Sequence, residues 1–192
     1  MYIWIYSSCS WLIPPRPDNC DGSYQSSCDS SRAYTNITDI LQAQDRGSLL
    51  SYMNKYWLNQ DGSNEEFWSH EWDKHGTCVN TIDPTCYGSN YEPQQEVGDF
   101  FQKTVDLFKS LNTYQALSDA GITPGGSYDL SDIEDALAKI HDGKKPYVSC
   151  ESGALNQVYY YFVLRGNAID GTYKAVDSSE LPFHISMSSC LY

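Results

Sequence analysis

The sequence predicts a single domain of the α+β class, and three observations support this prediction. The chain has 192 residues, which suits one domain with a sizeable core and is short for two. Hydrophobic residues make up 41% and charged residues 19%, as in a globular rather than a disordered protein. Segments with helical periodicity lie in the middle of the chain, whereas strand-like segments come late.

Four segments are expected to be helical, and two of them carry clear end signals. Ser63 or Asn64 is suited to cap a helix that has acidic residues in its first turn and stops at Gly76. Residues 131–134, Ser-Asp-Ile-Glu, match a capping box before a short helix that ends near His141. Apolar residues recur at helical spacing in the other two segments. The expected helices cover residues 37–57, 65–75, 97–117 and 131–141.

The remaining segments read as strands or loops. Residues 158–164 are aromatic and β-branched, which favours a buried strand, and 181–187 form a second candidate strand. Residues 14–36 contain Pro14, Pro15, Pro17 and an Asp-Gly pair, so they are expected to form a loop, as are residues 81–94.

The chain is strongly acidic, with a formal net charge of -13 at pH 7 and a pI near 4.4. Proteins that hold nucleic acid tightly carry a basic stripe, because neutralising phosphates supplies most of the affinity. The composition therefore argues against a nucleic-acid scaffold. If RNA is a substrate, binding is expected to be weak, transient and better at acid pH, where carboxylates lose charge and histidines gain it.

Seven cysteines are scattered along the chain without a CxxC pair, which argues against a thioredoxin-like or zinc-ribbon protein. Together with the sequon at Asn36, they favour an oxidising compartment and disulfides. The odd number leaves at least one thiol without an intramolecular partner. No run is long enough to span a membrane. Residues 1–11 are apolar but lack a basic start and a small-residue cleavage site, so they make a poor signal peptide.

The side chains best suited to acid–base chemistry occur together in the segment 67–78. On a helix, His70, Glu71, Lys74 and His75 lie at roughly 0°, 100°, 40° and 140°, all on one side. Histidine can act as general acid or base near neutrality. Lysine can stabilise charge that builds on a phosphoryl oxygen, and a neighbouring carboxylate can raise the pKa of a histidine. The four side chains together suit chemistry on an anion.

This face has two other interpretations. A charged helix face is most often a solvated surface. A zinc site is the second alternative, but metalloprotease helices place two histidines four residues apart so that both reach one metal. Here the spacing is five, which splays the two rings by roughly 140°. We therefore expect no metal.

Residues 68–78, Trp-Ser-His-Glu-Trp-Asp-Lys-His-Gly-Thr-Cys, resemble the second active-site segment of the T2 family of secreted endoribonucleases. Residues 17–24, Pro-Asp-Asn-Cys-Asp-Gly-Ser-Tyr, resemble the sequence that follows the first active-site segment in fungal members. Residues 147–150 and Cys190 are similar to the late disulfide region. The resemblance implies a central antiparallel sheet with helices packed on it, in one domain of residues 17–192 that follows an aberrant segment 1–16.

The resemblance also implies a reaction, RNA cleavage through a 2′,3′-cyclic phosphate without metal or cofactor. His75 would be the base of the first step. Glu71 and Lys74 would stabilise the pentacoordinate phosphorane, and His70 would hold the phosphate.

Substrate contacts are implied at three further positions. Asp18 and Tyr24 match positions of the family's base-binding site, and we also expect Trp68 to contact substrate.

The chain departs from the family at the first active-site segment. Where the family has Trp-Thr-Ile-His-Gly-Leu-Trp-Pro, residues 11–17 read Trp-Leu-Ile-Pro-Pro-Arg-Pro, one residue shorter. The second acid–base histidine is absent, and Arg16 replaces the base-stacking tryptophan. His141 is expected to end a surface helix and His184 to lie in a strand, so neither is expected to replace it. General acid–base catalysis by one side chain typically contributes about 10²–10⁴-fold, so activity should be badly impaired.

Disulfides and processing are also implied by the resemblance. Cys28–Cys78 and Cys150–Cys190 would keep their partners. Cys20 and Cys86 would lose theirs, with Cys9 a stand-in for one at most, and the family's N-terminal strand would be missing. A single cause upstream of residue 17, such as a misread intron or an alternative first exon, is our hypothesis for these departures. Asn36 is the expected glycosylation site.

The function expected from the sequence is that of a secreted or vacuolar, monomeric T2-type endoribonuclease that acts on single-stranded RNA with impaired activity. The alternative is a non-catalytic secreted protein of the same family that binds RNA or a protein. A metalloenzyme, the third interpretation, would be sensitive to EDTA, and we expect no such sensitivity.

Overall fold

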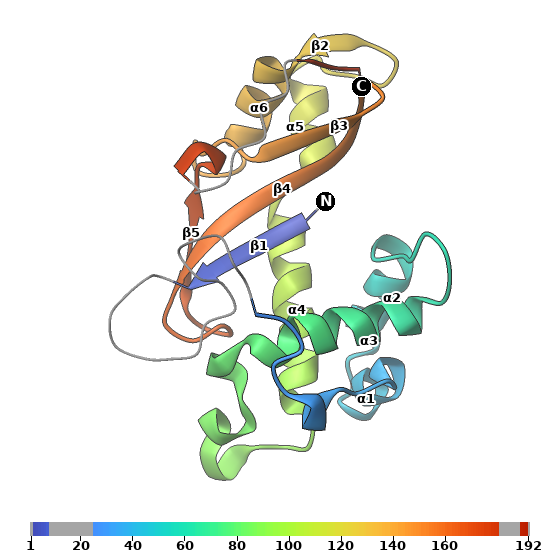
Figure 1. Cartoon of the computed structure of the whole chain (residues 1–192), viewed down its shortest axis with the longest axis vertical. Helices are drawn as coiled ribbons and strands as arrows, with labels where there is room; N and C mark the ends of the chain where they lie inside the picture. The colour runs from blue at the N-terminus through green and yellow to red at the C-terminus, as the bar shows by residue number, and fades with distance from the viewer. Residues whose placement is uncertain (1, 8–24, 181–188, 192) are drawn as a thin grey trace.

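The computed structural model describes residues 2–7, 25–180 and 189–191, and for the strands 2–7 and 189–191 only the backbone. The first helices of the chain gather in one half of the molecule, whereas the strands and the last two helices occupy the other half (Figure 1). The helices are α1 (Ile37–Ala43), α2 (Gly47–Tyr56), α3 (Asn64–Lys74), α4 (Gln95–Ser110), α5 (Thr113–Asp119) and α6 (Leu130–Ala138).

The sheet is built around β4 (Ala154–Arg165), the longest strand. β3 (Tyr147–Glu151) and β5 (Thr172–Val176) pair with it antiparallel, one after the other. β1 (Tyr2–Ser7) pairs with it in parallel. β6 (Ser189–Leu191) meets β4 at Ala154 and pairs antiparallel with β2 (Ser127–Asp129). The predicted α+β class is confirmed, and the parallel β1 makes the antiparallel sheet a mixed one.

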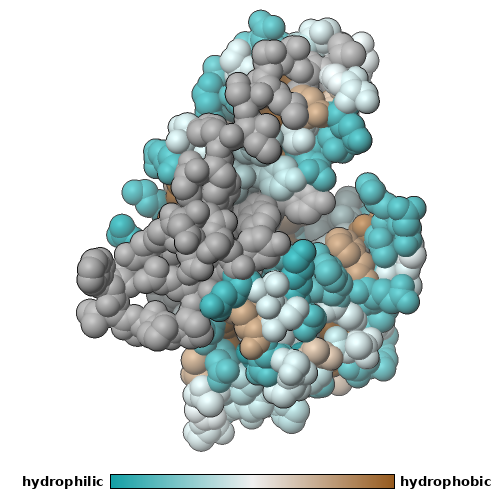
Figure 2. All heavy atoms as spheres, in the orientation of Figure 1, coloured by the Kyte–Doolittle hydropathy of each residue, from teal (hydrophilic) through white to brown (hydrophobic). Residues whose placement is uncertain are grey.

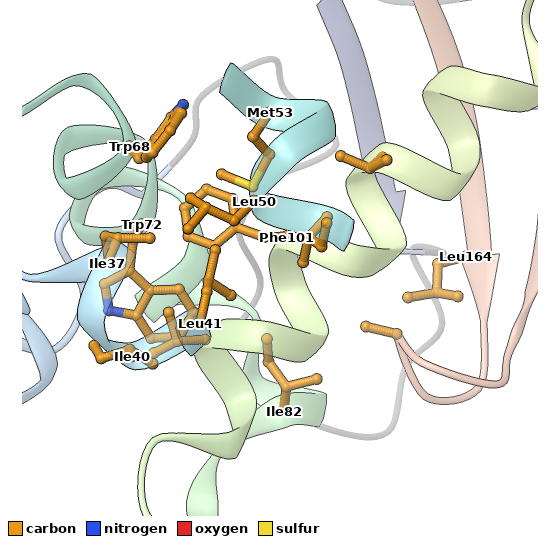
Figure 3. Packing of buried hydrophobic residues seen from close by; sticks show 14 residues of the cluster. Ile37, Ile40, Leu41, Leu50, Met53, Trp68, Trp72, Ile82, Phe101 and Leu164 are labelled. Carbon is orange, nitrogen blue, oxygen red and sulfur yellow. The ribbon is translucent and has the colours of Figure 1, made fainter. Parts of the chain in front are cut away.

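The helical half has its own hydrophobic core, in which α1 to α4 pack together (Figure 3). Trp68 and Trp72 of α3 are almost completely buried there, and Phe101 of α4 and Met53 of α2 lie between the helices. Burying each such side chain contributes about 1.5–3 kcal/mol. This core therefore fixes the rotation of α3 about its axis.

A second core lies where α5 and α6 cover the sheet. Ile133 and Leu137 of α6 are completely buried against it, as are Val148 of β3 and Tyr160 of β4. The predicted buried strand 158–164 is therefore confirmed as the centre of β4.

Two expected helices are each divided in the structure. The segment 37–57 forms α1 and α2, because Asp45 between them adopts a left-handed backbone with φ of 55°. The segment 97–117 forms α4 and α5, because the helix ends before Leu111 and Asn112 caps a new one by accepting a hydrogen bond from Gln115 N at 3.2 Å. Apolar periodicity continues across both breaks and does not reveal them.

Other expectations were wrong in detail. The capping box at 131–134 is not used, because α6 begins one residue earlier with Asp129 at its N-cap position. Residues 81–94 contain the 3₁₀ turns η3 (Asn80–Ile82) and η4 (Pro84–Asn90). The expected loss of an N-terminal strand is also wrong, because β1 lies beside β4; its aromatic and β-branched residues favour strand formation. The candidate strand 181–187 lies outside the described residues.

Candidate active site

The side chains predicted to do chemistry lie on α3 and its C-terminal end. Ser63 caps the helix, and its Oγ accepts a hydrogen bond from Glu66 N at 3.1 Å. The opposite face is anchored by two indoles. Trp68 Nε1 donates to the Trp57 carbonyl at 2.9 Å, and Trp72 Nε1 donates to the Arg32 carbonyl at 2.6 Å. With both indoles held in the core, the other face of the helix is turned outward.

His75 stands at the point where the helix ends. It is the C-cap residue, and its backbone N–H donates to the Glu71 carbonyl at 3.0 Å. The chain then turns through η2 (Gly76–Cys78). At Gly76 a Cβ atom would lie 2.2 Å from Cε3 of Trp72, so the turn packs directly on the buried indole. This packing fixes the backbone that carries His75.

The segment 25–32 holds this end of the helix from outside. A disulfide joins Cys28 to Cys78, as the resemblance implied. Ser27 N donates to the Lys74 carbonyl at 3.2 Å, and Ser27 Oγ donates to Asp73 Oδ2 at 2.8 Å. Cys28 N donates to Thr77 Oγ1 at 3.0 Å. We call residues 25–32 the clasp.

Arg32 completes the clasp from a buried position. Its guanidinium donates to the Thr77 carbonyl at 3.0 Å and pairs with Asp29 at 2.8 Å. It also lies 5.9 Å from the ring centroid of Trp72. Hydrogen bonds from Ser31 and Arg32 lower the pKa of Asp29 to about 2, so the carboxylate stays charged beside the guanidinium at acid pH. No sequence pattern indicated this role for Arg32; the implied Cys28–Cys78 pairing was the only signal that the clasp approaches α3.

The four predicted side chains influence one another electrostatically. Burial raises the pKa of Glu71, against the effect of the nearby His70 and Lys74. Burial also lowers the pKa of His75 to about 4, and Lys74 and His70 act in the same direction. His70 is exposed, whereas the other three are half-buried. At about pH 5 the His75 imidazole is therefore mostly neutral and able to accept a proton.

This arrangement suits acid–base chemistry on an anion. A neutral imidazole can act as a general base. An ammonium beside it can stabilise negative charge that develops on a phosphoryl oxygen. A carboxyl group whose pKa is raised keeps its proton to higher pH and can donate a hydrogen bond. The site therefore defines a class, a small α+β protein with a helix-borne acid–base cluster suited to phosphoryl chemistry.

The comparisons with known proteins give the family. The model of the Ribonuclease T2 family matches residues 10–176. Ribonuclease M of Aspergillus phoenicis is 64% identical over 176 residues, which cover 89% of this chain and 74% of that protein. Ribonuclease T2 of Aspergillus oryzae is 61% identical over 176 residues, which cover 90% of this chain and 63% of that protein.

A solved structure agrees with these sequence matches. The crystal structure of Actibind, a T2 ribonuclease, superposes with a TM-score of 0.80 at 64% identity, and covers 84% of this chain and 69% of that chain. The chain therefore belongs to the ribonuclease T2 family, a family of endoribonucleases.

Several predicted site residues are placed differently from the expectation or lie outside the description. Trp68 is 1% exposed and lies in the core, which argues against a substrate contact, and that contact stays an untested prediction. Asp18 and Tyr24 lie outside the described residues. Cys150 is disulfide-bonded, but its predicted partner Cys190 has no described side chain, so that pairing stays a prediction.

His141 is also placed differently from the expectation. It was expected at the end of a surface helix, yet it is 2% exposed. Both ring nitrogens lie near backbone carbonyls, Nδ1 at 2.9 Å from that of Lys144 and Nε2 at 3.1 Å from that of Tyr161. Its role is structural, as expected, but inside the core. His184 lies outside the described residues.

Three further observations concern the described part of the chain. No helix in it is both long and apolar enough to cross a membrane. In the same residues, no group of three or more histidine, cysteine or acidic side chains is placed to hold a metal ion. Cys86 is a free and exposed cysteine.

Proposed function

We propose that this chain cleaves single-stranded RNA through a 2′,3′-cyclic phosphate, at a rate reduced by the missing first-segment histidine. The observation that carries the proposal is the position of His75 at the end of α3, with a pKa of about 4 and with Lys74 and Glu71 beside it. A base in this state is ready to accept a proton in mildly acid solution, where repulsion between RNA and an acidic protein is weakest.

In the proposed step, neutral His75 accepts the proton of the ribose 2′-hydroxyl. The 2′-oxygen forms a bond to the adjacent phosphorus, and the bond from phosphorus to the 5′-oxygen breaks. Lys74 balances the charge on the phosphoryl oxygens, His70 holds the phosphate, and Glu71, whose pKa is raised by burial, helps to stabilise the phosphorane. The leaving 5′-oxygen takes its proton from water, because residues 11–17 contain no histidine. That substitution of solvent for a positioned acid is the reason for the reduced rate.

Export to an oxidising compartment is part of the proposal. The Cys28–Cys78 disulfide and the disulfide-bonded Cys150 support it, because such bonds persist mainly outside the cytosol. Asn36 is exposed at the start of α1, where a glycan attached to its amide would reach solvent.

The test is RNA cleavage by the purified chain at about pH 4–5 in the presence of EDTA, beside a His75→Ala variant purified in the same way. We expect products that end in a cyclic phosphate, and a decrease of about 10²–10⁴-fold in the variant. Equal rates in the two proteins would show that His75 is not the base. Loss of cleavage by EDTA would show that a metal takes part.

A non-catalytic family member that binds RNA or a protein is the second candidate. It is favoured by one observation, the sequence Pro14-Pro15-Arg16 in place of the family's histidine-containing segment. Absence of cleavage by a protein that still unfolds cooperatively would support this candidate, as would RNA affinity that His75→Ala leaves unchanged.

A further inference from the structure

A cluster of aromatic and lysine side chains lies on α2 and α4, apart from the acid–base cluster. Tyr52 and Tyr56, one turn apart on α2, have ring centroids 4.6 Å apart. Lys55 Nζ lies 4.9 Å from the centroid of Tyr56, and Lys109 Nζ lies 4.3 Å from that of Tyr52. Phe108 contacts Tyr52 edge-on at 6.2 Å. We call these five residues the aromatic–lysine patch.

The patch is accessible to solvent. Tyr56 is 51% exposed, and among the described residues Tyr114 is the only other exposed aromatic side chain. Lys55 and Lys109 are both exposed. An exposed ring that is already ordered by a neighbouring ring offers a flat face for stacking at little entropic cost.

The two lysines belong to the cations of the described residues that form no ion pair. Arg32, Arg46, Lys144 and Lys145 each form an ion pair with a carboxylate. In the described parts of the chain, neither Lys55 nor Lys109 takes part in an ion pair. Asp106, one turn before Lys109, accepts a hydrogen bond from Gln102 at 2.9 Å instead.

The electrostatics around Lys55 agree with this observation. A hydrogen bond with Tyr56 is the largest cause that raises the pKa of Lys55, and no carboxylate is among the causes. In a chain with a net charge of -13, two ammonium groups without a carboxylate partner beside an exposed ring form a local binding surface for an anion.

The patch is connected to the catalytic helix. The end of α2 leads into a short loop whose Asn59 N donates to Asn64 Oδ1 at 2.9 Å, at the start of α3. Trp57, next to Tyr56, accepts the indole hydrogen bond of Trp68. This loop lies at the start of α3 and His75 at its end, and the helix rises by about 15 Å between Glu65 and His75. Figure 1 shows α2 beside α3, and Figure 2 shows a notch in the molecular outline next to α2.

We propose that the aromatic–lysine patch binds the single-stranded RNA at a distance of a few nucleotides from the scissile phosphate, with Tyr56 stacking on a base and Lys55 and Lys109 contacting phosphates. The inference rests on the proposed function, since it requires RNA to be the ligand. The aromatic–lysine patch gives this acidic, weakly binding protein a second contact with long RNA strands. Because the patch adjoins the start of α3 and His75 lies at its end, we expect that a dinucleotide bound at His75 does not reach the patch.

The test compares two uncleavable probes, a 2′-O-methyl strand of about 12 nucleotides and a 2′-O-methyl dinucleotide, by fluorescence anisotropy at several salt concentrations in acid buffer. Tyr56→Ala is compared with Tyr114→Ala, which removes another exposed tyrosine, 64% exposed on α5. The double variant Lys55→Ala/Lys109→Ala is compared with Lys139→Ala/Lys174→Ala, which removes two exposed lysines elsewhere. Thermal melts establish that all variants are folded.

We expect Tyr56→Ala to weaken binding of the long strand about tenfold, as the loss of one stacked base does. Removing Lys55 and Lys109 should reduce the slope of log affinity against log salt by about 1.4, since each phosphate contact on a single strand contributes about 0.7. Both control variants and all dinucleotide affinities should match those of the wild type.

The proposal is overturned if the patch variants bind the long strand as their controls do. If the wild type cleaves RNA in that case, the proposed function stands and only the patch assignment fails. If instead the patch variants lose affinity while the wild type shows no cleavage, the patch assignment stands and the catalytic proposal fails.

Discussion

His75 and Lys74 are adjacent in the chain, and the charge of the lysine disfavours a second positive charge on the imidazole. Replacing Lys74 with Gln should therefore raise the pKa of His75 from about 4 toward its ordinary value of 6.5, although burial keeps it below that value. NMR titration of the His75 ring measures this shift directly. The acid limb of any cleavage profile should move to higher pH with it, because the base must be neutral.

The control for this experiment is Lys139→Gln, which removes an exposed lysine from the end of α6. It should leave the titration of His75 unchanged. A His75 pKa that is the same in Lys74→Gln as in the wild type would mean that burial and His70 set it without Lys74.

Gly76 is required for a steric reason that a substitution can test. A methyl group at this position would meet the ring of Trp72, which is completely buried and cannot move away. Gly76→Ala should therefore lower the free energy of unfolding by about 1–3 kcal/mol, the usual cost of overpacking a core. Chemical denaturation measures this change.

Gly47→Ala is the matched substitution, because nothing lies within 4 Å of a Cβ at the first residue of α2. It should be neutral or slightly stabilising, since it restricts the unfolded chain. Equal destabilisation by both substitutions would show that the cost arises from the backbone and not from contact with Trp72.

At the scale of single residues, the sequence predicted the members of the acid–base cluster. It did not predict that the Trp68 side chain of the same segment lies in the core. Helical geometry places His70, Glu71, Lys74 and His75 on one side, and the structure brings them within electrostatic range of one another. Trp68 belongs to the same motif but faces the core. A motif shows that residues occur together, whereas the direction of a side chain depends on packing against distant elements.

At the scale of elements, the clasp and α3 form one unit that depends on the Cys28–Cys78 disulfide, which closes a segment with a sequence separation of 50. The double substitution Cys28→Ser/Cys78→Ser should lower stability by about 2–5 kcal/mol. It should also reduce any cleavage activity, because the Ser27 and Cys28 contacts fix the end of the helix that carries His75. Thermal unfolding and cleavage assays measure the two effects.

Cys86→Ser provides the control, since it removes a free and exposed thiol without touching the clasp. It should leave both measurements unchanged. A double variant with wild-type stability would contradict a structural role for the disulfide.

The boundaries of helices were harder to predict from the sequence than their presence. Periodicity placed helices correctly in the middle of the chain, but the left-handed Asp45 and the cap at Asn112 divide two of them. These breaks depend on single backbone conformations and caps, which leave the apolar pattern intact. β1 was missed because residues 1–16 were interpreted as an aberrant segment, although the composition of residues 2–7 suits a strand.

For the whole molecule, His141 links the fold to pH. It lies between the carbonyls of Lys144 and Tyr161, and its ring contacts Tyr160 and Phe162 edge-on. Burial lowers its pKa, while the two carbonyls and the charges of Asp142 and Asp177 act in the opposite direction, and burial has the larger effect. The folded protein therefore binds this proton less readily than the unfolded chain does.

The consequence is a loss of stability in acid. As the pH falls below about 6.5, His141 becomes protonated in the unfolded chain but not in the folded protein, so folding is opposed until the pH reaches the folded-state pKa. His75, whose pKa is lowered to about 4, adds to the same trend. Each group contributes up to about 1.4 kcal/mol per pH unit within its own window.

His141→Gln separates this effect from the rest of the fold. The variant should be less stable than the wild type at neutral pH, because a buried carbonyl loses a well-placed donor, at a cost of about 1–3 kcal/mol. Its stability should also fall less steeply as the pH is lowered, because Gln does not titrate. Urea denaturation at a series of pH values measures both quantities, and Lys139→Gln, which removes an exposed lysine from the end of α6, serves as the control. A slope for His141→Gln as steep as that of the wild type would show that folding does not lower the pKa of His141.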